Sequence, residues 1–428
     1  MSMLKKLYKS ELLGEQYTCI DHPSGAKIYV FPKEMSSTYA LFATNYGAVD
    51  VAANGTPLPD GIAHFLEHKL FANEDGSDSF ERFSELGADA NAYTSHTSTV
   101  YLFSCTDLFD EAFTELLEFV THPYFTKENV KNEQGIIGEE IRMCLDNPYD
   151  RCYYQMLAGL YSEHPIRHDI CGSLASIATI TPELLYHTHK TFYDLANMTM
   201  VVVGNVTPEA VLAVADRVLP PKAQGNKPAR TLTNEPNGVA HPRLEANGQV
   251  AKPIFSIGFK DTVIPTDPAE RIKRDAGMAI LNEMLFSEAS ELYGTLFEGG
   301  YISPELSFEY VLSRDFAFDQ LAGEADDPDA VLGIVLDHFR QQKERGFDEN
   351  ELLRCRRIEY AEYIKGFDST EEIAHNLLSF AMEGAELFSY PDVLKEIDLD
   401  YITALFSEVF DPVHVTLSVI YPNKEETL

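Results

Sequence analysis

The stretch DGIAHFLEHKLF, residues 60–71, holds the side chains of this chain whose types and spacing could do chemistry. If residues 62–71 form a helix, His64, Glu67 and His68 share one side and the isoleucine and leucines share the other. Two imidazoles at positions i and i+4 can bind one metal ion, and Glu67 beside them is placed as a general base for water on that ion. The alternative is a surface helix with two solvated histidines, which the interposed glutamate and the apolar reverse face disfavour.

A zinc site needs at least a third protein ligand. In TKENVKNEQGIIGEEIRM, residues 126–143, Glu133 and Glu140 lie about 20° apart on a helix, on a face that also carries valine and isoleucine. Glu139 points to the polar side instead. Carboxylates on an apolar stripe are costly to bury unless a cation neutralises them, so Glu140 or Glu133 is the expected third ligand. The alternative is a helix whose apolar stripe ends at solvent.

Two other histidine pairs are poor metal sites. Pro165 makes His164 a cap or turn residue, so it does not pair with His168 on a helix. His187 and His189 diverge by about 200° on a helix. We expect all four histidines to be structural or surface residues.

The elements that must position these residues mix strands and helices without strict alternation. Apolar patterns predict two amphipathic helices, over residues 110–122 and 207–219, and strands over residues 26–32, 38–49, 97–105 and 199–205. This order predicts an α+β fold in which helices pack on a mainly antiparallel sheet.

One segment divides the 428 residues into nearly equal halves. Residues 220–253 repeat Pro, Gly and Asn without apolar periodicity, which predicts an exposed connector. We therefore expect an N-terminal domain over residues 1–219, which bears the metal ligands, and a C-terminal domain over residues 254–428.

The two halves also resemble each other in sequence. Residues 191–209 are similar to residues 409–425, and residues 125–141 are similar to residues 347–364, in the same order within each half. Two such similarities indicate a duplicated fold, whose second copy lacks the metal site.

Composition excludes several classes of function. The formal charge of −35 disfavours nucleic-acid binding, which needs clustered lysine and arginine. No apolar run approaches the roughly 20 residues of a membrane span, and no signal peptide is evident. Six cysteines without paired spacing indicate reduced thiols and a cytoplasmic protein.

The motif H-x-x-E-H, filled by His64, Glu67 and His68, resembles the inverted zinc signature of the inverzincins. The whole chain resembles the pitrilysin and mitochondrial processing peptidase family, in its short bacterial branch. The similarity covers, in the family's order, GIAHFLEHKLF, LGADANAYTSHTSTVYLF, ENVKNEQGIIGEEI, EHPIRHDICGSLASIATIT and FYDLANMTMVVVGNV.

This resemblance implies a role for each candidate residue. His64, His68 and Glu140 would bind one zinc ion per chain, Glu67 would activate the water, and Glu133 would orient a histidine ligand. The fold that it implies is two similar α+β halves that enclose a clamshell-like chamber.

The resemblance also implies a substrate-binding edge strand at Asn91 and Ala92, where an extended peptide would add to the sheet. Taken from the residues alone, Asn91 is instead predicted to lie in a turn.

One block departs from the family pattern. Members carry an arginine and a tyrosine in L-R-E-x-x-G-x-x-Y, but residues 292–303 read LYGTLFEGGYIS, with Phe297 at the arginine position and Tyr301 too early. The departure implies a heterodimer with a similar subunit that lacks the zinc motif and supplies the missing groups. Self-association, or substitution by Arg314 or Tyr310, is the alternative.

The expected function is therefore a zinc metalloendopeptidase, or its catalytic subunit, that hydrolyses peptides or small unfolded polypeptides in a chamber, with Glu67 as the general base on zinc-bound water. The alternative is a catalytically quiet scaffold or a peptide-binding subunit of a two-subunit assembly. We expect no membrane partner.

Overall fold

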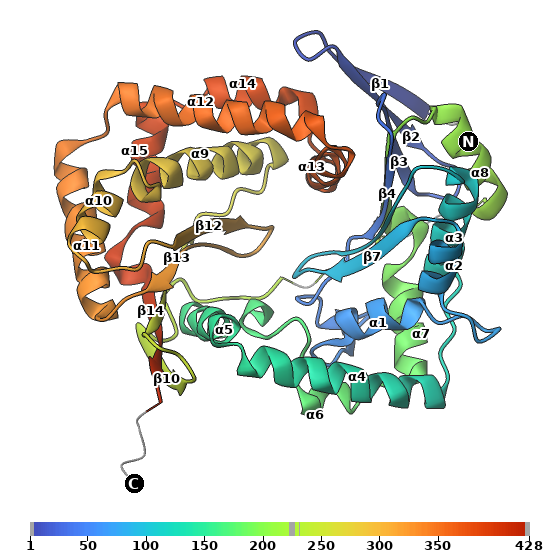
Figure 1. The fold of residues 1–428 in the computed structure, drawn as a ribbon, viewed down its shortest axis with the longest axis horizontal. Coiled ribbons are helices and arrows are strands. Elements are labelled where there is room, and N and C mark those ends of the chain that lie inside the picture. The colour runs from blue at the N-terminus through green and yellow to red at the C-terminus, as the bar shows by residue number, and fades with distance from the viewer. Residues whose placement is uncertain (1–3, 222–226, 231, 424–428) are drawn as a thin grey trace. The chain divides into compact units, whose positions relative to one another are not determined.

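The computed structural model describes residues 4–221, 227–230 and 232–423. The chain forms two compact units, and each unit is built from segments that are separate in the sequence (Figure 1). Unit 1 consists of Met1–Ile141, Asp169–Thr231 and Ile364–Phe388. Unit 2 consists of Arg142–His168, Leu232–Tyr363 and Ser389–Leu428.

Unit 1 contains a seven-stranded sheet in the order β1-β2-β3-β9-β4-β8-β7. Neighbouring strands are antiparallel except β3 and β9, which are parallel. Strand β4 is buried at every position, as expected for a strand inside the sheet, whereas β7 lies at its edge. The strands are β1 (Leu4–Ser10), β2 (Glu15–Asp21), β3 (Lys27–Pro32), β4 (Thr38–Thr44), β7 (Asp89–Thr94), β8 (Thr99–Cys105) and β9 (Met198–Gly204), with a separate pair β5 (Ala52–Ala53) and β6 (Thr56–Pro57).

Two helices of unit 1 begin at a threonine cap. Helices α7 and α8 follow Thr181 and Thr207, whose hydroxyl groups accept backbone N–H bonds, and each has proline in its first turn. The helices are α1 (Ile62–Leu70), α2 (Ser79–Glu85), α3 (Phe109–Thr121), α6 (Leu174–Ile177), α7 (Pro182–Phe192), α8 (Pro208–Val218) and α13 (Thr370–Glu383), and α4 (Lys127–Asp146) begins in this unit. Short 3₁₀ turns are η2 (Leu195–Asn197), η3 (Gly366–Asp368) and η4 (Leu387–Ser389).

Unit 2 contains a five-stranded sheet in the order β10-β14-β11-β13-β12, in which only β10 and β14 are parallel. Its strands are β10 (Arg243–Gly248), β11 (Ile254–Lys260), β12 (Leu306–Leu312), β13 (Ala317–Glu324) and β14 (Val415–Pro422). Its helices are α5 (Pro148–Leu160), α9 (Pro268–Phe286), α10 (Glu291–Glu298), α11 (Pro328–Arg345), α12 (Glu349–Lys365), α14 (Tyr390–Lys395) and α15 (Leu399–Val409), with η1 (Pro165–Arg167) and η5 (Pro412–His414). Within the described part of the chain, no helix has the length and apolar character of a membrane span.

The two units repeat one topology. Strands β3-β9-β4-β8-β7 of unit 1 correspond to β10-β14-β11-β13-β12 of unit 2, including the single parallel pair. The helices follow in the same chain order, so that α1, α2, α3, α4 and α7 correspond to α9, α10, α11, α12 and α15. The predicted α+β fold of two similar halves is confirmed, and unit 1 adds the hairpin β1–β2.

The units differ from the contiguous ranges 1–219 and 254–428 because two helices are exchanged. Helix α5 comes from the first half of the sequence but packs on β11 and β14 of unit 2, whereas α13 comes from the second half and packs on β4 and β9 of unit 1. Gly258 in β11 permits the close approach of α5, since a Cβ there would lie 2.6 Å from the sulfur of Met156. Nothing in the local sequence pattern signals this exchange.

Residues 222–226 and 231 of the expected connector lie outside the described residues, and the described rest of 220–253 is only partly an exposed loop. It includes β10, and Glu235 accepts hydrogen bonds from the backbone N–H groups of residues 162–164 and from Lys260 Nζ at 2.8 Å. The side chains of Glu235 and Lys260 are 8% and 4% exposed. Both these polar contacts and the apolar packing of Ala246 and Val250 on Cys152, Ile254 and Ile420 attach the described part of this segment to unit 2.

Candidate metal centre

Helix α1 begins at a position that requires glycine. Gly61, its N-cap, has a φ of 85°, and a Cβ there would lie 2.4 Å from the carbonyl oxygen of Cys171. From that start, Ile62, Leu66 and Leu70 face the core and are at most 3% exposed. These apolar residues pack one side of α1 against the core, and His64, Glu67 and His68 lie on the opposite side.

The polar side of α1 faces the C-terminal part of α4. The Nε2 atoms of His64 and His68 are 3.2 Å apart, and the Glu140 carboxylate oxygens lie 3.6 Å from the first and 3.7 Å from the second. Among the described residues these three are the one set of His, Cys, Asp or Glu side chains whose ligand atoms all lie within 4.8 Å of one another.

The spacing of these three side chains fits a metal ion. Ligands at about 2.0–2.1 Å from tetrahedral zinc lie about 3.3–3.4 Å from one another, close to the distances observed. The donor set of two imidazoles and one carboxylate is the type that zinc takes when a fourth position stays open. The side chain of His64 is 9% exposed and that of Glu140 is 39% exposed, so the site is open to solvent on the Glu140 side.

Glu133 contacts His68 on the Nδ1 side of its ring. Its Oε1 lies 3.2 Å from His68 Nδ1, and its Oε2 accepts a hydrogen bond from Lys69 Nζ at 3.1 Å. Glu133 is 9% exposed and Lys69 is 5% exposed, so the lysine neutralises a carboxylate that would be costly to bury alone. The two glutamates on one face of α4 therefore take different positions, Glu140 at the Nε2 side and Glu133 at the Nδ1 side.

Glu67 precedes His68 on α1 but is not one of the three residues whose ligand atoms converge. It is 8% exposed, and its Oε2 accepts a hydrogen bond from the Thr94 hydroxyl at 2.7 Å. Burial raises the pKa of Glu67, an effect that the Thr94 bond partly offsets. A carboxylate of raised basicity next to a metal position has the properties of a general base.

The two imidazoles have opposite electrostatic surroundings. Burial, with the neighbouring His68, lowers the pKa of His64 to about 3, so its ring is neutral and can offer a lone pair. Burial, the largest single effect, disfavours charge on His68, but the hydrogen bond to Glu133 and the nearby charges of Glu67, Glu133 and Glu140 together raise its pKa. A proton on Nδ1 directed at Glu133 leaves the Nε2 of His68 as the donor atom for a metal.

Asn91 and Ala92 lie in β7, the edge strand of the sheet in unit 1, next to the strand end that carries Thr94. Asn91 is exposed, and its Oδ1 accepts a hydrogen bond from the Ala92 N–H at 2.9 Å. Asn91 thus lies in a strand rather than in a turn, and β7 pairs with β8 on one side only.

Several contacts of the site had no signal in the sequence. Thr94 and Lys69 belong to no motif, although Lys69 directly follows His68 and its burial is unusual for a lysine. Tyr93 of β7 also contacts His375 of α13, whose Nδ1 lies 3.2 Å from its hydroxyl. Tyr93 and His375, and likewise Thr94 and Glu67, are far apart in the chain, so only the fold brings the members of each pair together.

Residues 292–303, the block that departs from the family pattern, lie in unit 2. Phe297 is 44% exposed and Tyr301 is 42% exposed. The hydroxyl of Tyr310 donates a hydrogen bond to Asp261 at 2.6 Å, and Arg274 binds both carboxylate oxygens of Asp261. Tyr310 is therefore engaged inside unit 2, while Arg314 lies in the turn between β12 and β13.

The remaining histidine pairs have structural contacts, as predicted. His164 caps η1 by accepting the Ile166 N–H at 3.1 Å. His187 and His189 bond the backbone carbonyls of residues 53 and 120.

Comparisons with known proteins show the family to which the chain is similar. Residues 53–173 match the family described as Insulinase (Peptidase family M16), and residues 179–359 match the Peptidase M16 inactive domain. The chain is 36% identical over 414 residues to the "Uncharacterized zinc protease YmfH" of Bacillus subtilis (strain 168), covering 93% of this chain and 95% of that protein.

Solved structures share the fold over nearly the whole chain. The crystal structure of an M16-like peptidase from Alicyclobacillus acidocaldarius matches with a TM-score of 0.89 and 30% identity, covering 99% of both chains. Pitrilysin matches with a TM-score of 0.73 and 15% identity, covering 98% of this chain and 46% of that one.

Proposed function

The chain belongs to the insulinase family of peptidases, family M16, and from this premise we propose that it is a zinc-dependent endopeptidase that cleaves peptides or small unfolded polypeptides. The observation that carries the proposal is the convergence of His64 Nε2, His68 Nε2 and the Glu140 carboxylate beside the carboxylate of Glu67. A scaffold has no need to keep a general base next to three metal ligands, which is why the enzyme is preferred.

His64, His68 and Glu140 would hold the zinc ion, one per chain. When bound, zinc supplies a Lewis acid that polarises the scissile carbonyl and lowers the pKa of water to about 7. Glu133 keeps the Nδ1 proton of His68 and thereby directs its Nε2 to the metal, while Lys69 holds Glu133 in its charged form.

Glu67 would carry the proton transfers. Its carboxylate removes a proton from the attacking water and returns it to the leaving amine. The Thr94 hydroxyl holds Oε2, which leaves Oε1 for the transfer and orients the carboxylate. Burial of Glu67 favours its basicity, because the charged form is disfavoured in a site of low polarity.

The unpaired edge of β7 would bind the substrate. An extended peptide can add to this strand through backbone hydrogen bonds at Asn91 and Ala92, near the Thr94 end that contacts Glu67.

A partner subunit is part of the proposal. Phe297 cannot supply the guanidinium expected at its position, and the hydroxyl of Tyr310 is bound to Asp261. A similar subunit without the zinc motif would supply these groups, so hydrolysis by the mixture should exceed hydrolysis by this chain alone. The cytoplasmic location stays a prediction.

The deciding experiment measures zinc content and peptide hydrolysis for Glu67→Gln. Loss of the base should lower turnover by about 10²–10⁴-fold while one zinc per chain is retained. Glu139→Gln, an exposed glutamate on α4, is the control and should keep both properties. If Glu67→Gln cleaves the peptide at the parental rate, Glu67 is not the base and the proposed mechanism fails.

A further inference from the structure

Helix α9 of unit 2 can be set in register with α1 of unit 1. Each helix ends in a buried Leu-Phe pair, residues 70–71 in the first and 285–286 in the second. Aligning these pairs places Ala279, Asn282 and Glu283 at the positions of His64, Glu67 and His68.

The other two elements around the metal centre also have counterparts. Phe125 and Phe347 precede α4 and α12, and their alignment places Cys355 and Glu362 at the positions of Glu133 and Glu140. The hairpins β7–β8 and β12–β13 have four-residue turns of equal length, which places Glu309 at the position of Asn91.

All six counterpart residues line one cavity of about 370 Å³. Helix α9 packs on β12, and residues of these two elements and of α12 line the cavity. Its wall carries five carboxylates and no lysine, arginine or histidine among the described residues: Asp275, Glu283, Glu309, Glu359 and Glu362.

These carboxylates do not form a second metal centre. The described residues contain one set of three ligand atoms within 4.8 Å of one another, and it is the set in unit 1. The carboxylates of unit 2 surround an open volume instead. A ligand that touches several of them must be larger than a bare metal ion.

A buried amide indicates the kind of ligand. Asn282 is 2% exposed; its Nδ2 donates to Asp319 Oδ2 at 2.6 Å, and its Oδ1 has no hydrogen-bond partner. An unpaired buried acceptor is costly, and no donor of the described lining is bonded to this oxygen. Carboxylates and an amide oxygen all accept hydrogen bonds. The ligand that matches them is therefore a positively charged group with several N–H donors.

Carboxylates of the cavity lie close enough to raise one another's pKa. Burial raises the pKa of Glu309. Burial also raises the pKa of Glu359, and the nearby Glu362 and Glu283 add to this effect although the Tyr390 hydroxyl opposes it. Arg354 lies 3.6 Å from Glu283 but does not line the cavity. An entering cation would relieve this repulsion.

We propose that this cavity binds an organic cation, the guanidinium or ammonium group of a basic side chain in a peptide. Glu309 and Phe308 belong to β12, an edge strand, so the main chain of such a peptide has a place beside the cavity. The cavity therefore selects for arginine or lysine. The inference concerns binding in unit 2 and does not depend on hydrolysis in unit 1.

The test is calorimetric titration of the full chain with acetyl-Gly-Arg-Gly-amide and with the same peptide carrying citrulline, which has the shape of arginine without its charge. The arginine peptide should bind at least about tenfold more tightly. Glu309→Gln should remove most of that difference and leave the citrulline peptide unaffected. Glu359→Gln, checked for folding by thermal unfolding, should act in the same direction. Equal affinity of the two peptides for the parent chain would overturn the inference.

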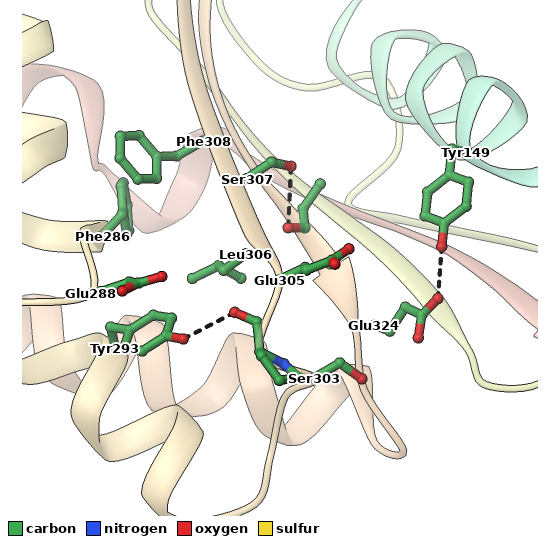
Figure 2. Close-up of a pocket in the computed structure, with 13 residues that line it drawn as sticks. Tyr149, Phe286, Glu288, Tyr293, Ser303, Glu305, Leu306, Ser307, Phe308 and Glu324 are labelled. Atoms are coloured by element: carbon green, nitrogen blue, oxygen red, sulfur yellow. Dashed lines mark hydrogen bonds between the residues drawn. The ribbon is translucent and has the colours of Figure 1, made fainter.

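A neighbouring cavity of unit 2 provides the matched control. Its volume is about 760 Å³, and Glu288, Glu305 and Glu324 line it, the last one bonded to the Tyr149 hydroxyl (Figure 2). Glu305→Gln removes the same charge as Glu309→Gln and should leave arginine-peptide binding unchanged. If Glu305→Gln weakens binding and Glu309→Gln does not, the cation sits in the neighbouring cavity and the inference is wrong.

Two further titrations test whether the bound cation is a free polyamine or a metal ion instead of a peptide side chain. Spermidine that binds more tightly than the arginine peptide, with the same loss in Glu309→Gln, would make the ligand a free polyamine and contradict the peptide. Calcium binding that Glu309→Gln abolishes would make it a metal ion. Repeating the peptide titration in Glu67→Gln should give an unchanged affinity, so failure here is distinguishable from failure of the proposed peptidase.

Discussion

The metal centre of unit 1 and the acidic cavity of unit 2 are surrounded by equivalent elements, α1, α4 and β7 in the first and α9, α12 and β12 in the second. In unit 1, two imidazoles and one carboxylate converge to within 3.2–3.7 Å. In unit 2, alanine and glutamate stand at the histidine positions and the carboxylates stay apart. One backbone arrangement thus surrounds both proposed cation sites, and a few side chains decide how their polar groups are arranged.

The two sites also treat buried negative charge differently. Glu133 contacts both His68 and Lys69, and these bonds lower its pKa although burial alone would raise it. The cavity of unit 2 has no such internal cation along its described lining. Arg354, outside the lining, pairs with Glu283 at 3.6 Å, so the protein compensates the charge of the cavity only in part and an entering cation would add to that compensation.

The largest expected effect is loss of a metal ligand. Glu140→Gln should weaken zinc binding by more than about 100-fold, beyond the range for residues that only support a ligand. Competition with a chelator measures the affinity, and Glu139→Gln is the control. An unchanged affinity would show that Glu140 is not a ligand and would remove the main difference between the two sites.

Loss of the supporting carboxylate should have a smaller effect. Glu133→Gln should weaken zinc binding by about 10–100-fold, because His68 loses the acceptor that directs its Nε2. The same chelator competition measures it. An effect as large as that of Glu140→Gln would reverse the roles of the two glutamates.

The correspondence of α1 with α9 and of α4 with α12 can be tested by adding histidines to unit 2. Ala279→His combined with Glu283→His should create a second, weaker zinc site, since Glu362 stands at the position of Glu140. Without a counterpart of Glu133, its affinity should be about 10–100-fold below that of the site in unit 1. Zinc content at saturation measures it, with Ala279→His alone as the control. A folded double variant that binds no additional zinc would contradict the register of α1 and α9.

The smallest effect concerns a lysine–glutamate pair that serves structure alone. Glu235→Gln should lower the free energy of unfolding by about 1–3 kcal/mol at neutral pH, because Lys260 loses its buried partner. Burial opposes the charge of Glu235, but Lys260 and three backbone N–H groups lower its pKa to about 2. The unfolded value is about 4.3, so this stabilisation is complete above pH 5 and is lost as pH falls from about 4 to 2.

Denaturant unfolding at several pH values measures this prediction. Glu344→Gln, an exposed glutamate on α11, should have no comparable effect. If the stability difference between Glu235→Gln and the parent persists at pH 2, the pair does not act through the charge of Glu235.

The sequence by itself determined the candidate ligands on α1. His64, Glu67 and His68 lie within five residues, so helix geometry alone places them on one side and the apolar residues on the other. The same local rule placed Glu133 and Glu140 on one face of α4. It did not distinguish them; the resemblance to a known family assigned Glu140 to the metal.

Only the tertiary structure decided which atom each glutamate faces, that Thr94 and Lys69 contact the site, and that α5 and α13 are exchanged between the units. It also revealed the cavity in unit 2, whose walls come from α9, β12 and α12. The physical reason is the range of the contacts. Periodicity records which side of an element is apolar, whereas the partner of each side depends on how distant segments pack.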